Sequence, residues 1–274
     1  LIHGPLDPGG FVVYSSWNSR YRVVKNCRLL LEISDDKGVE GFSKTVEAYQ
    51  LLLALNMQNA NGIKIAPYNG LESTEVSKAA AFTALSASFM DPAGSMTKGV
   101  YHVFGSGQGD QKNSIYENPS ASYVRTMAHM SFKTDAETGD PRFSSKVVER
   151  ADTTKYDGLI SNIAVSVWSG AYDPITIVRN EELVLLKAEA NIGKGGDGLT
   201  EINAVRAAHG LAATTTGGLD QLLHEKRYSL FMEGHRWVDM RRYGKTSTLP
   251  NDRPARGDKV FDSFPLPEAE TKGK

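Results

Sequence analysis

Apolar residues recur every three or four positions in two parts of the chain, one toward each end, and this spacing predicts helices. Toward the N-terminus, one helix follows Ser15 and Ser16 and ends at the turn SDDKG, and the next ends at NANG. Two helices joined by a short polar turn form a helical hairpin. An alanine-rich run from Thr74 to Met90 predicts a third helix.

The C-terminal part has the same character. Helices are predicted from Arg179 to Ile192 and from Leu199 to His209, with GKGGDG between them and a glycine where a helix often ends. After the breaker TTTGG, one long helix is predicted from Leu219 to about Tyr243. The tail beyond it contains four prolines and is expected to be extended.

The segment between these parts lacks apolar periodicity and is rich in Gly, Ser, Asn and Pro, with short strand-like pieces such as GVYHVF. An irregular segment of this length within a compact domain is often functional. We therefore expect one mainly all-α domain over residues 1–274. Its parts are helical hairpins at 1–92, a loop-rich insert at 93–178, a helical scaffold at 179–245 and an extended tail at 246–274.

Charge and apolar content narrow the function classes. The chain has 31 Lys and Arg against 32 Asp and Glu, a balance that gives no overall attraction for nucleic acid. Its richest apolar run, LLLALNM, is too short to span a bilayer. The single cysteine, Cys27, lies in a helical pattern and is expected to be buried. Because the chain starts at LIHGPLDPGG, without Met or a signal-peptide pattern, we expect a fragment or a processed chain.

The sequence carries no recognised catalytic, cofactor or metal motif. GSGQGD has glycines at G-x-G-x-G spacing and no predicted helix after it, which favours a flexible turn over a dinucleotide-binding loop. On one helix, His224 and His235 would be about 16 Å apart, too far to share a metal ion. No G-x-S-x-G elbow occurs. We therefore expect no catalytic residues, no metal and no cofactor.

The charges of the predicted helix 219–243 coincide with its apolar stripe. On a helical wheel, Lys226, Glu233 and Arg241 fall in or beside that stripe, where a nucleic-acid-binding arm would not place them. Gly234 also lies on the stripe, where it would let a neighbouring helix approach closely. Because buried charges persist when they are paired, we predict an internal ion-pair network between the helices. Its predicted members are Glu182, Glu189, Arg206, Glu225, Glu233, Arg236, Asp239 and Arg242.

Four segments resemble the SusD/RagB family: RNEELVLLKAEANI, INAVRAAHGL, HEKRYSLFMEGHRWVDMRRYGK and the tail FPLPEAE. The family patterns are R-x-x-E-L-x-L-L-x-A-E-A, N-x-x-R-x-R-A-G-L, E-R-x-x-E-x-x-x-E-G-x-R-x-x-D-L-x-R and I-P-x-x-E. Upstream, SSWNSRYRVVKNCRLLLE and KTVEAYQLLLALNMQNANGI resemble the tetratricopeptide-like helices of the family. The sequence departs from the pattern at Lys226 and Arg227, where a single Arg is usual, and at His209, which replaces Arg or Ala.

The resemblance implies tetratricopeptide-like hairpins that form an α-α superhelix with a loop-rich, ligand-binding insert. It also implies a glycan- or nutrient-binding lipoprotein, and not an enzyme, on the extracellular face of the outer membrane. Such a protein passes its oligosaccharide to a TonB-dependent, SusC-like transporter. We expect the lipidated N-terminal cysteine that anchors it to be absent from this chain.

Ligand contacts in this family lie in variable loops, so the candidates come from chemistry. Aromatic rings pack against the apolar faces of sugars, and polar side chains bind the hydroxyl groups. The insert offers Trp168, Tyr172, Tyr101, Phe104, Tyr116 and Asn113, of which Trp168 and Tyr172, beside an expected turn, are the first choice. The alternative function is a tetratricopeptide-like scaffold that binds peptide or protein ligands, and a glycosidase is a third hypothesis.

Overall fold

The computed structural model describes residues 11–58, 63–65, 74–76, 90–156 and 158–263. The chain divides into two compact units, of which the first combines residues 1–89 with 238–274 and the second is 90–237. Helices form most of the regular structure, which agrees with the predicted mainly helical class. The tetratricopeptide-like superhelix and the single-domain boundaries stay predictions.

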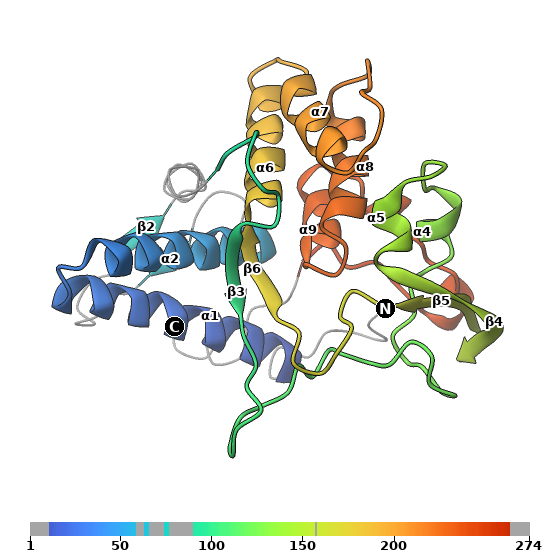
Figure 1. Ribbon diagram of the computed structural model, residues 1–274, viewed down its shortest axis with the longest axis horizontal. Helices are drawn as coiled ribbons and strands as arrows, with labels where there is room; N and C mark the ends of the chain where they lie inside the picture. The colour runs from blue at the N-terminus through green and yellow to red at the C-terminus, as the bar shows by residue number, and fades with distance from the viewer. Residues whose placement is uncertain (1–10, 59–62, 66–73, 77–89, 157, 264–274) are drawn as a thin grey trace. The chain divides into compact units, whose positions relative to one another are not determined.

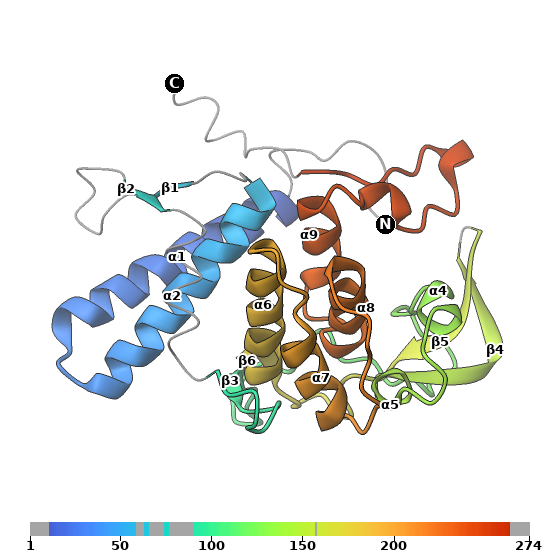
Figure 2. The same ribbon diagram turned by 90° about the horizontal axis from the view of Figure 1, so that it is seen from above.

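The first unit contains a hairpin of two long helices (Figures 1 and 2). Helix α1 spans Phe11–Ile33 and α2 spans Lys37–Gln58, which confirms the first predicted hairpin. A two-stranded antiparallel sheet of β1 (Ile63–Ile65) and β2 (Thr74–Val76) follows. The third predicted helix is therefore wrong at its start, and the rest of it, residues 77–89, lies outside the described residues.

Buried apolar side chains join the two helices of this hairpin. Val24 and Cys27 of α1 and Val46 of α2 are among its buried residues, so the cysteine is buried as predicted. An ion pair of 2.7 Å between Arg28 Nε and Glu47 Oε1 connects the same two helices. Within the described ranges, no helix combines the length and the apolar character needed to cross a membrane.

Three helices of the second unit pack side by side in both views (Figures 1 and 2). They are α6 (Asn180–Gly193), α7 (Leu199–Ala208) and α8 (Leu219–Ser229). Their shared core consists of Met96, Val184, Leu185, Ala188, Ile202, Val205, Leu222 and Leu230. The α6–α7 hairpin confirms the sequence prediction, since its helix bounds and the break at GKGGDG agree within a few residues.

The loop-rich insert contains more regular structure than its sequence indicated. β3 (Gly99–His102) pairs with β6 (Ile175–Arg179), and β4 (Val147–Tyr156) pairs with β5 (Leu159–Val165), both antiparallel. The predicted strand in GVYHVF is confirmed, whereas the β4–β5 hairpin was not expected. Two short helices, α4 (Ser131–Thr134) and α5 (Pro141–Ser144), precede it.

A second core lies beneath the β4–β5 hairpin. It consists of Ala128, Phe132, Val147, Ile163, Val165, Trp168 and Tyr228. The Phe132 ring stacks on Phe231, with 4.1 Å between the ring centres, and on Tyr228, with 4.9 Å. Because Tyr228 belongs to α8, this core connects the insert to the helical scaffold.

The long helix predicted from Leu219 to about Tyr243 is wrong, because the chain breaks it into α8 and α9 (His235–Arg242). Between them, Met232 and Gly234 have φ angles of 66° and 85°, which belong to the left-handed region and not to a right-handed helix. A Cβ added at Gly234 would meet nothing within 4 Å. The predicted role of this glycine, close approach of a helix, is therefore wrong, and its role is to turn the backbone.

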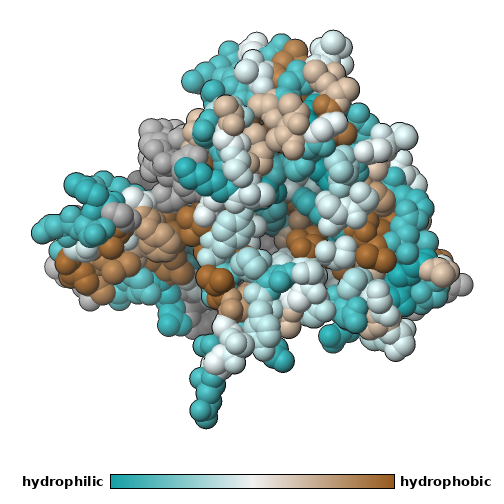
Figure 3. All heavy atoms as spheres, viewed as in Figure 1, coloured by the Kyte–Doolittle hydropathy of each residue, from teal (hydrophilic) through white to brown (hydrophobic). Residues whose placement is uncertain are grey.

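Two segments lie outside these elements: the loop after β3 and the tail after α9. The loop after β3 protrudes from the lower end of Figure 1, and its surface in Figure 3 is mostly hydrophilic. Up to residue 263 the tail forms two short 3-10 helices, Thr246–Thr248 and Pro254–Arg256, and is otherwise irregular, where the sequence predicted an extended chain. Its family-like segment FPLPEAE lies outside the described residues.

The turn between α8 and α9 can be tested by giving Gly234 a side chain. We expect Gly234→Ala to destabilise the protein by about 1–2 kcal/mol, because a left-handed conformation is unfavourable for a residue with Cβ. The melting temperature should fall by about 2–6 °C. The control is Gly193→Ala at the end of α6, where a Cβ also meets nothing within 4 Å and φ is not positive. Equal melting temperatures for both variants would contradict this role of Gly234.

Candidate functional site

Two loops of the insert are held together by Asn113. Its backbone N–H donates to Ala171 O at 2.7 Å, and its side-chain Nδ2 donates to Asp173 O at 3.0 Å. Its Oδ1 accepts a hydrogen bond of 3.0 Å from the N–H of Ile115. Asn113 is 3% exposed, so its amide serves the loops and is not open to a ligand.

Tyr172 stands at the surface of the second loop. It is 44% exposed, and the Nζ of Lys112 lies 5.8 Å from its ring centre. The turn behind it is closed by Asp173, whose Oδ2 accepts hydrogen bonds from Ser169 N–H at 2.6 Å and Gly170 N–H at 3.1 Å. The Ser169 hydroxyl and these N–H groups also hold the pKa of Asp173 below its ordinary value.

The other predicted ligand residues are more buried than Tyr172. Trp168 is 7% exposed and belongs to the core beneath β4–β5, and Tyr116 packs against the same core. Tyr101 is partly buried in β3 and its hydroxyl donates to Thr97 O. Phe104 is partly buried and meets His102 edge to face, with 4.7 Å between the ring centres. Tyr172 therefore has the most accessible ring among the predicted residues.

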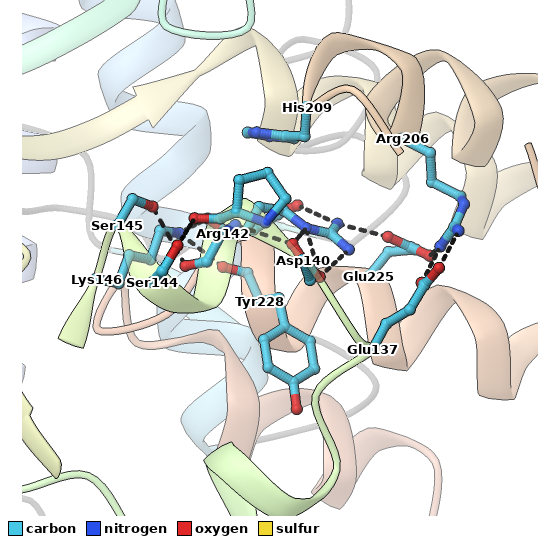
Figure 4. Close-up of polar contacts among 12 residues, drawn as sticks. Glu137, Asp140, Arg142, Ser144, Ser145, Lys146, Arg206, His209, Glu225 and Tyr228 are labelled. Carbon is cyan, nitrogen blue, oxygen red and sulfur yellow. Dashed lines mark hydrogen bonds and ion pairs between the residues drawn. The ribbon is translucent and has the colours of Figure 1, made fainter. Parts of the chain in front are cut away.

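Arg142 connects the insert to α8 (Figure 4). Its guanidinium contacts the carboxylates of Asp140, at 2.7 Å from Nη2 to Oδ2, and Glu225, and it donates to Ser229 Oγ at 3.1 Å. The side chains of Arg142, Asp140 and Glu225 are all 0% exposed. Burial alone would lower the pKa of Arg142, but the two carboxylates outweigh it and raise that pKa.

Arg206 of α7 extends this cluster on its other side (Figure 4). Its Nη1 lies 2.8 Å from Glu225 Oε1 and 2.9 Å from Glu137 Oε2. Its Nε donates to Ala212 O at 2.8 Å. Glu225 thus lies between a guanidinium from the insert and one from the helical scaffold, and each of its oxygens faces an arginine.

The C-terminal end of α8 is held by two further cations from outside the helix. Lys146 Nζ donates to Tyr228 O at 2.7 Å and to Ser229 O, and Arg179 Nη2 donates to Ser229 O at 2.6 Å. Positive charge is favourable at the carbonyl end of a helix. Burial nevertheless lowers the pKa of Lys146 to about 8.

Several of the residues predicted to form an ion-pair network do lie in ion pairs. Lys226 Nζ lies 3.0 Å from Glu189 Oε2, and Arg206 pairs with Glu225 as described above. Glu233 pairs with Arg179 of β6, at 2.9 Å, and not with Arg236. The backbone between Glu233 and Arg236 is not helical, so these two residues do not lie three positions apart on one helix.

The remaining predicted members are placed as follows. Glu182 Oε1 lies 3.5 Å from His235 Nε2, and Arg236 Nη1 donates to Leu223 O at 3.4 Å. Asp239, in α9, is 2% exposed, and Arg242 ends that helix. Buried acidic and basic groups thus recur along the segments that carry the sequence pattern.

The three departures from the family pattern each lie beside a carboxylate. Lys226 pairs with Glu189 as described above, and Arg227 Nη1 lies 2.7 Å from Asp135 Oδ2 of the insert. His209 Nε2 lies 2.7 Å from Glu181 Oε1. Each residue that departs from the family pattern therefore has a carboxylate partner in this structure.

The charged groups of this buried cluster pair with one another, which is typical of a structural role. Asp140, Glu225 and Glu137 each face a guanidinium. Among the described residues, no group of three or more His, Cys, Asp or Glu side chains is placed to hold a metal ion. Buried charges paired in this way fix the packing of the elements that carry them.

Sequence reasoning missed the connections from residues 131–146 to α8. Arg142 and Lys146 lie in a segment that was interpreted as irregular. A local signal was present, because Asp140 followed by Pro141 is a typical helix start, and Asp140 does cap α5 by accepting the N–H of Arg142 at 2.9 Å. No local signal indicates that Arg142 reaches a carboxylate 83 residues later.

Comparisons with known proteins identify a matching family model and similar folds. Residues 166–272 match the SusD family model. A laminarin-binding SusD-like protein superposes with a TM-score of 0.61 at 15% identity, over 95% of this chain and 84% of that one. A SusD superfamily protein from Parabacteroides distasonis gives 0.62 at 14% identity, over 98% and 85%.

A third structure is surface glycan-binding protein A from Bacteroides thetaiotaomicron in complex with laminarihexaose, with a TM-score of 0.55 at 14% identity, over 95% and 84%. At these identities the structures show a shared fold. A search of curated protein sequences gives no match. The family match and the shared fold together confirm the predicted resemblance.

Removing one partner of a buried pair should be costly. We expect Glu189→Ala to destabilise the protein by about 3 kcal/mol, because the ammonium of Lys226 stays buried without this carboxylate. Lys226 is 3% exposed at its side chain and Glu189 is 11% exposed. The measurement is urea unfolding, and the matched control is Glu149→Ala in the pair Lys133–Glu149, whose side chains are 42% and 45% exposed. An unchanged midpoint for Glu189→Ala would refute the structural role of this pair.

Protonation of Glu181 should contribute to the pH dependence of the protein's stability. Burial would raise its pKa, but His209 and Arg179 outweigh burial and lower it to about 2 from an ordinary value of 4.5. The ionised carboxylate therefore stabilises the fold above pH 4.5, and this contribution is lost as the pH falls toward 2. We expect the melting temperature of Glu181→Gln to fall less steeply than that of the parent protein in this range. The exposed variant Glu149→Gln should keep the parent slope, and equal slopes for both variants would disprove the assignment.

Proposed function

We propose, from the chain's place in the SusD family, that it is a cell-surface protein that captures glycans on the loops of its second unit. The observation that carries this proposal is the family match over residues 166–272. The similar structures support it, because they include a laminarin-binding protein and a glycan-binding protein in complex with laminarihexaose. The buried ion pairs support it indirectly, since their charges pair within the scaffold and leave ligand capture to other parts of the second unit.

The ligand surface that we propose centres on the paired loops joined by Asn113. Tyr172 offers the main aromatic face, and Phe104 and Tyr101 offer partly exposed rings on the first loop and its strand. Rings of this kind pack against the apolar faces of sugars. Asn113 positions the loops, while Trp168 and Tyr116 support the surface from the core.

Delivery of the captured glycan is the second part of the proposal. The captured oligosaccharide passes to a TonB-dependent, SusC-like transporter in the outer membrane. A lipidated N-terminus attaches the protein to the extracellular face of that membrane. The protein binds its ligand without chemical change, in keeping with similar structures that are glycan-binding proteins.

Binding to a glycan array, followed by titration of the best oligosaccharide, tests this function. We expect Tyr172→Ala to weaken binding about tenfold, because the sugar loses an aromatic face, and to leave the melting temperature unchanged. Trp168→Ala should instead destabilise the protein by about 3–5 kcal/mol, since a large buried ring is removed from the core. Unchanged affinity in Tyr172→Ala would show that the glycan binds to another surface.

The peptide-binding alternative gives a different outcome of the same experiment. Saturable binding of peptides together with no response on the glycan array would replace glycan capture by peptide capture. Release of shorter sugars from a bound oligosaccharide would replace binding by catalysis.

A further inference from the structure

The side chain of Lys112 lies beside Tyr172, the most exposed of the predicted aromatic residues. It is exposed, and within the described part of the chain no carboxylate lies within ion-pair distance of its Nζ. That Nζ is 5.8 Å from the centre of the Tyr172 ring. The two side chains come from loops that are 60 residues apart in sequence, so the fold has placed them together.

The position of this pair is set by a buried group. Asn113, the residue after Lys112, bonds to Ala171 and Asp173, the residues on either side of Tyr172. The backbone on both sides is thus joined by hydrogen bonds of 2.7 and 3.0 Å. Lys112 and Tyr172 therefore stand on one connected piece of backbone, which lowers the entropy lost when both contact a ligand.

Asp110, the carboxylate nearest to Lys112 in the sequence, and Asp173, the carboxylate next to Tyr172, are engaged within their own loops. Asp110 Oδ2 accepts the N–H of Gly107 at 2.8 Å, and Asp173 Oδ2 accepts Ser169 and Gly170 N–H groups. These bonds hold both carboxylates in turns, and neither pairs with Lys112. The ammonium is consequently available to an anionic group from outside the protein.

We propose that Lys112 and Tyr172 form a subsite for an acidic sugar, a hexuronic acid within a glycan chain. The C–H face of the sugar ring packs on the Tyr172 ring, and its carboxylate receives the ammonium of Lys112. A neutral hexose makes the first contact and lacks the second. This inference rests on the proposed glycan-binding function and adds the chemical class of the ligand.

The expected preference is modest, because the ion pair would be exposed and screened by salt. A single exposed ion pair changes affinity by about three- to fivefold. Raising the salt from about 50 mM to 500 mM shortens the screening length to a few ångströms and should remove most of that preference. Salt sensitivity separates the role of this charge from a role in loop structure.

The experiment compares glycans that differ only by the carboxylate. β-1,4-linked oligoglucuronate is matched with cello-oligosaccharide, and oligomannuronate with manno-oligosaccharide, each titrated by calorimetry at low and high salt. The parent protein should bind at least one acidic member more tightly than its neutral match. Lys112→Gln should abolish that difference, Lys112→Arg should keep it, and Tyr172→Ala should weaken both members. Lys194→Gln, an exposed lysine beyond α6, serves as the control.

The outcomes separate this inference from the function on which it rests. Equal or tighter binding of every neutral member, or an acidic preference that survives in Lys112→Gln, would overturn the subsite and leave glycan capture standing. Absence of binding to either panel and to the glycan array would overturn both.

Discussion

The contact between Arg142 and Glu225 is the interaction on which the second unit depends. Both side chains are fully buried, and they join the loop-rich insert to α8. A guanidinium and a carboxylate removed from water are tolerable only while each keeps its partner. Asp140, Glu137 and Arg206 complete the arrangement, so that two arginines pair with three carboxylates. Loss of any one of these groups would leave an opposite charge buried.

This constraint explains why the recognisable sequence pattern and the proposed ligand surface occupy different places. Glu189 pairs with Lys226, and Glu225 pairs with Arg206 and Arg142. None of these residues belongs to the loops around Tyr172. The pattern therefore reports how the scaffold is assembled. The loops that it supports are free to vary in sequence, provided that their inner residues still reach the scaffold.

Several features of the fold were predictable because they depend on local sequence. The α6–α7 hairpin follows from helical spacing and from the glycines of GKGGDG, and the pairing of Lys226 with Glu189 agrees with the expectation that these charges lie inward. The break after α8 was not predictable in the same way. Met232 is a good helix former, so its own helix propensity does not account for its left-handed conformation.

The candidate site was predictable in composition and not in geometry. Aromatic residues of the insert were identified by type, but burial depends on contacts between distant segments. Trp168 was expected beside an exposed turn, and it lies instead in a core completed by Tyr228 from α8. Nothing in the local sequence indicated a role for Lys112. Its place over Tyr172 depends on the hydrogen bond from Asn113 to a loop 60 residues away.

The separation of Arg142 and Glu225 along the chain also affects the order of folding. The ribosome adds Arg142 of α5 83 residues before it adds Glu225, and Tyr228 follows only three residues later. Until then, the core around Phe132 lacks one wall and Arg142 lacks a buried carboxylate from α8. Contacts of such long range form late in synthesis and slow the final step of folding. The insert thus reaches its native packing only when the C-terminal scaffold closes over it.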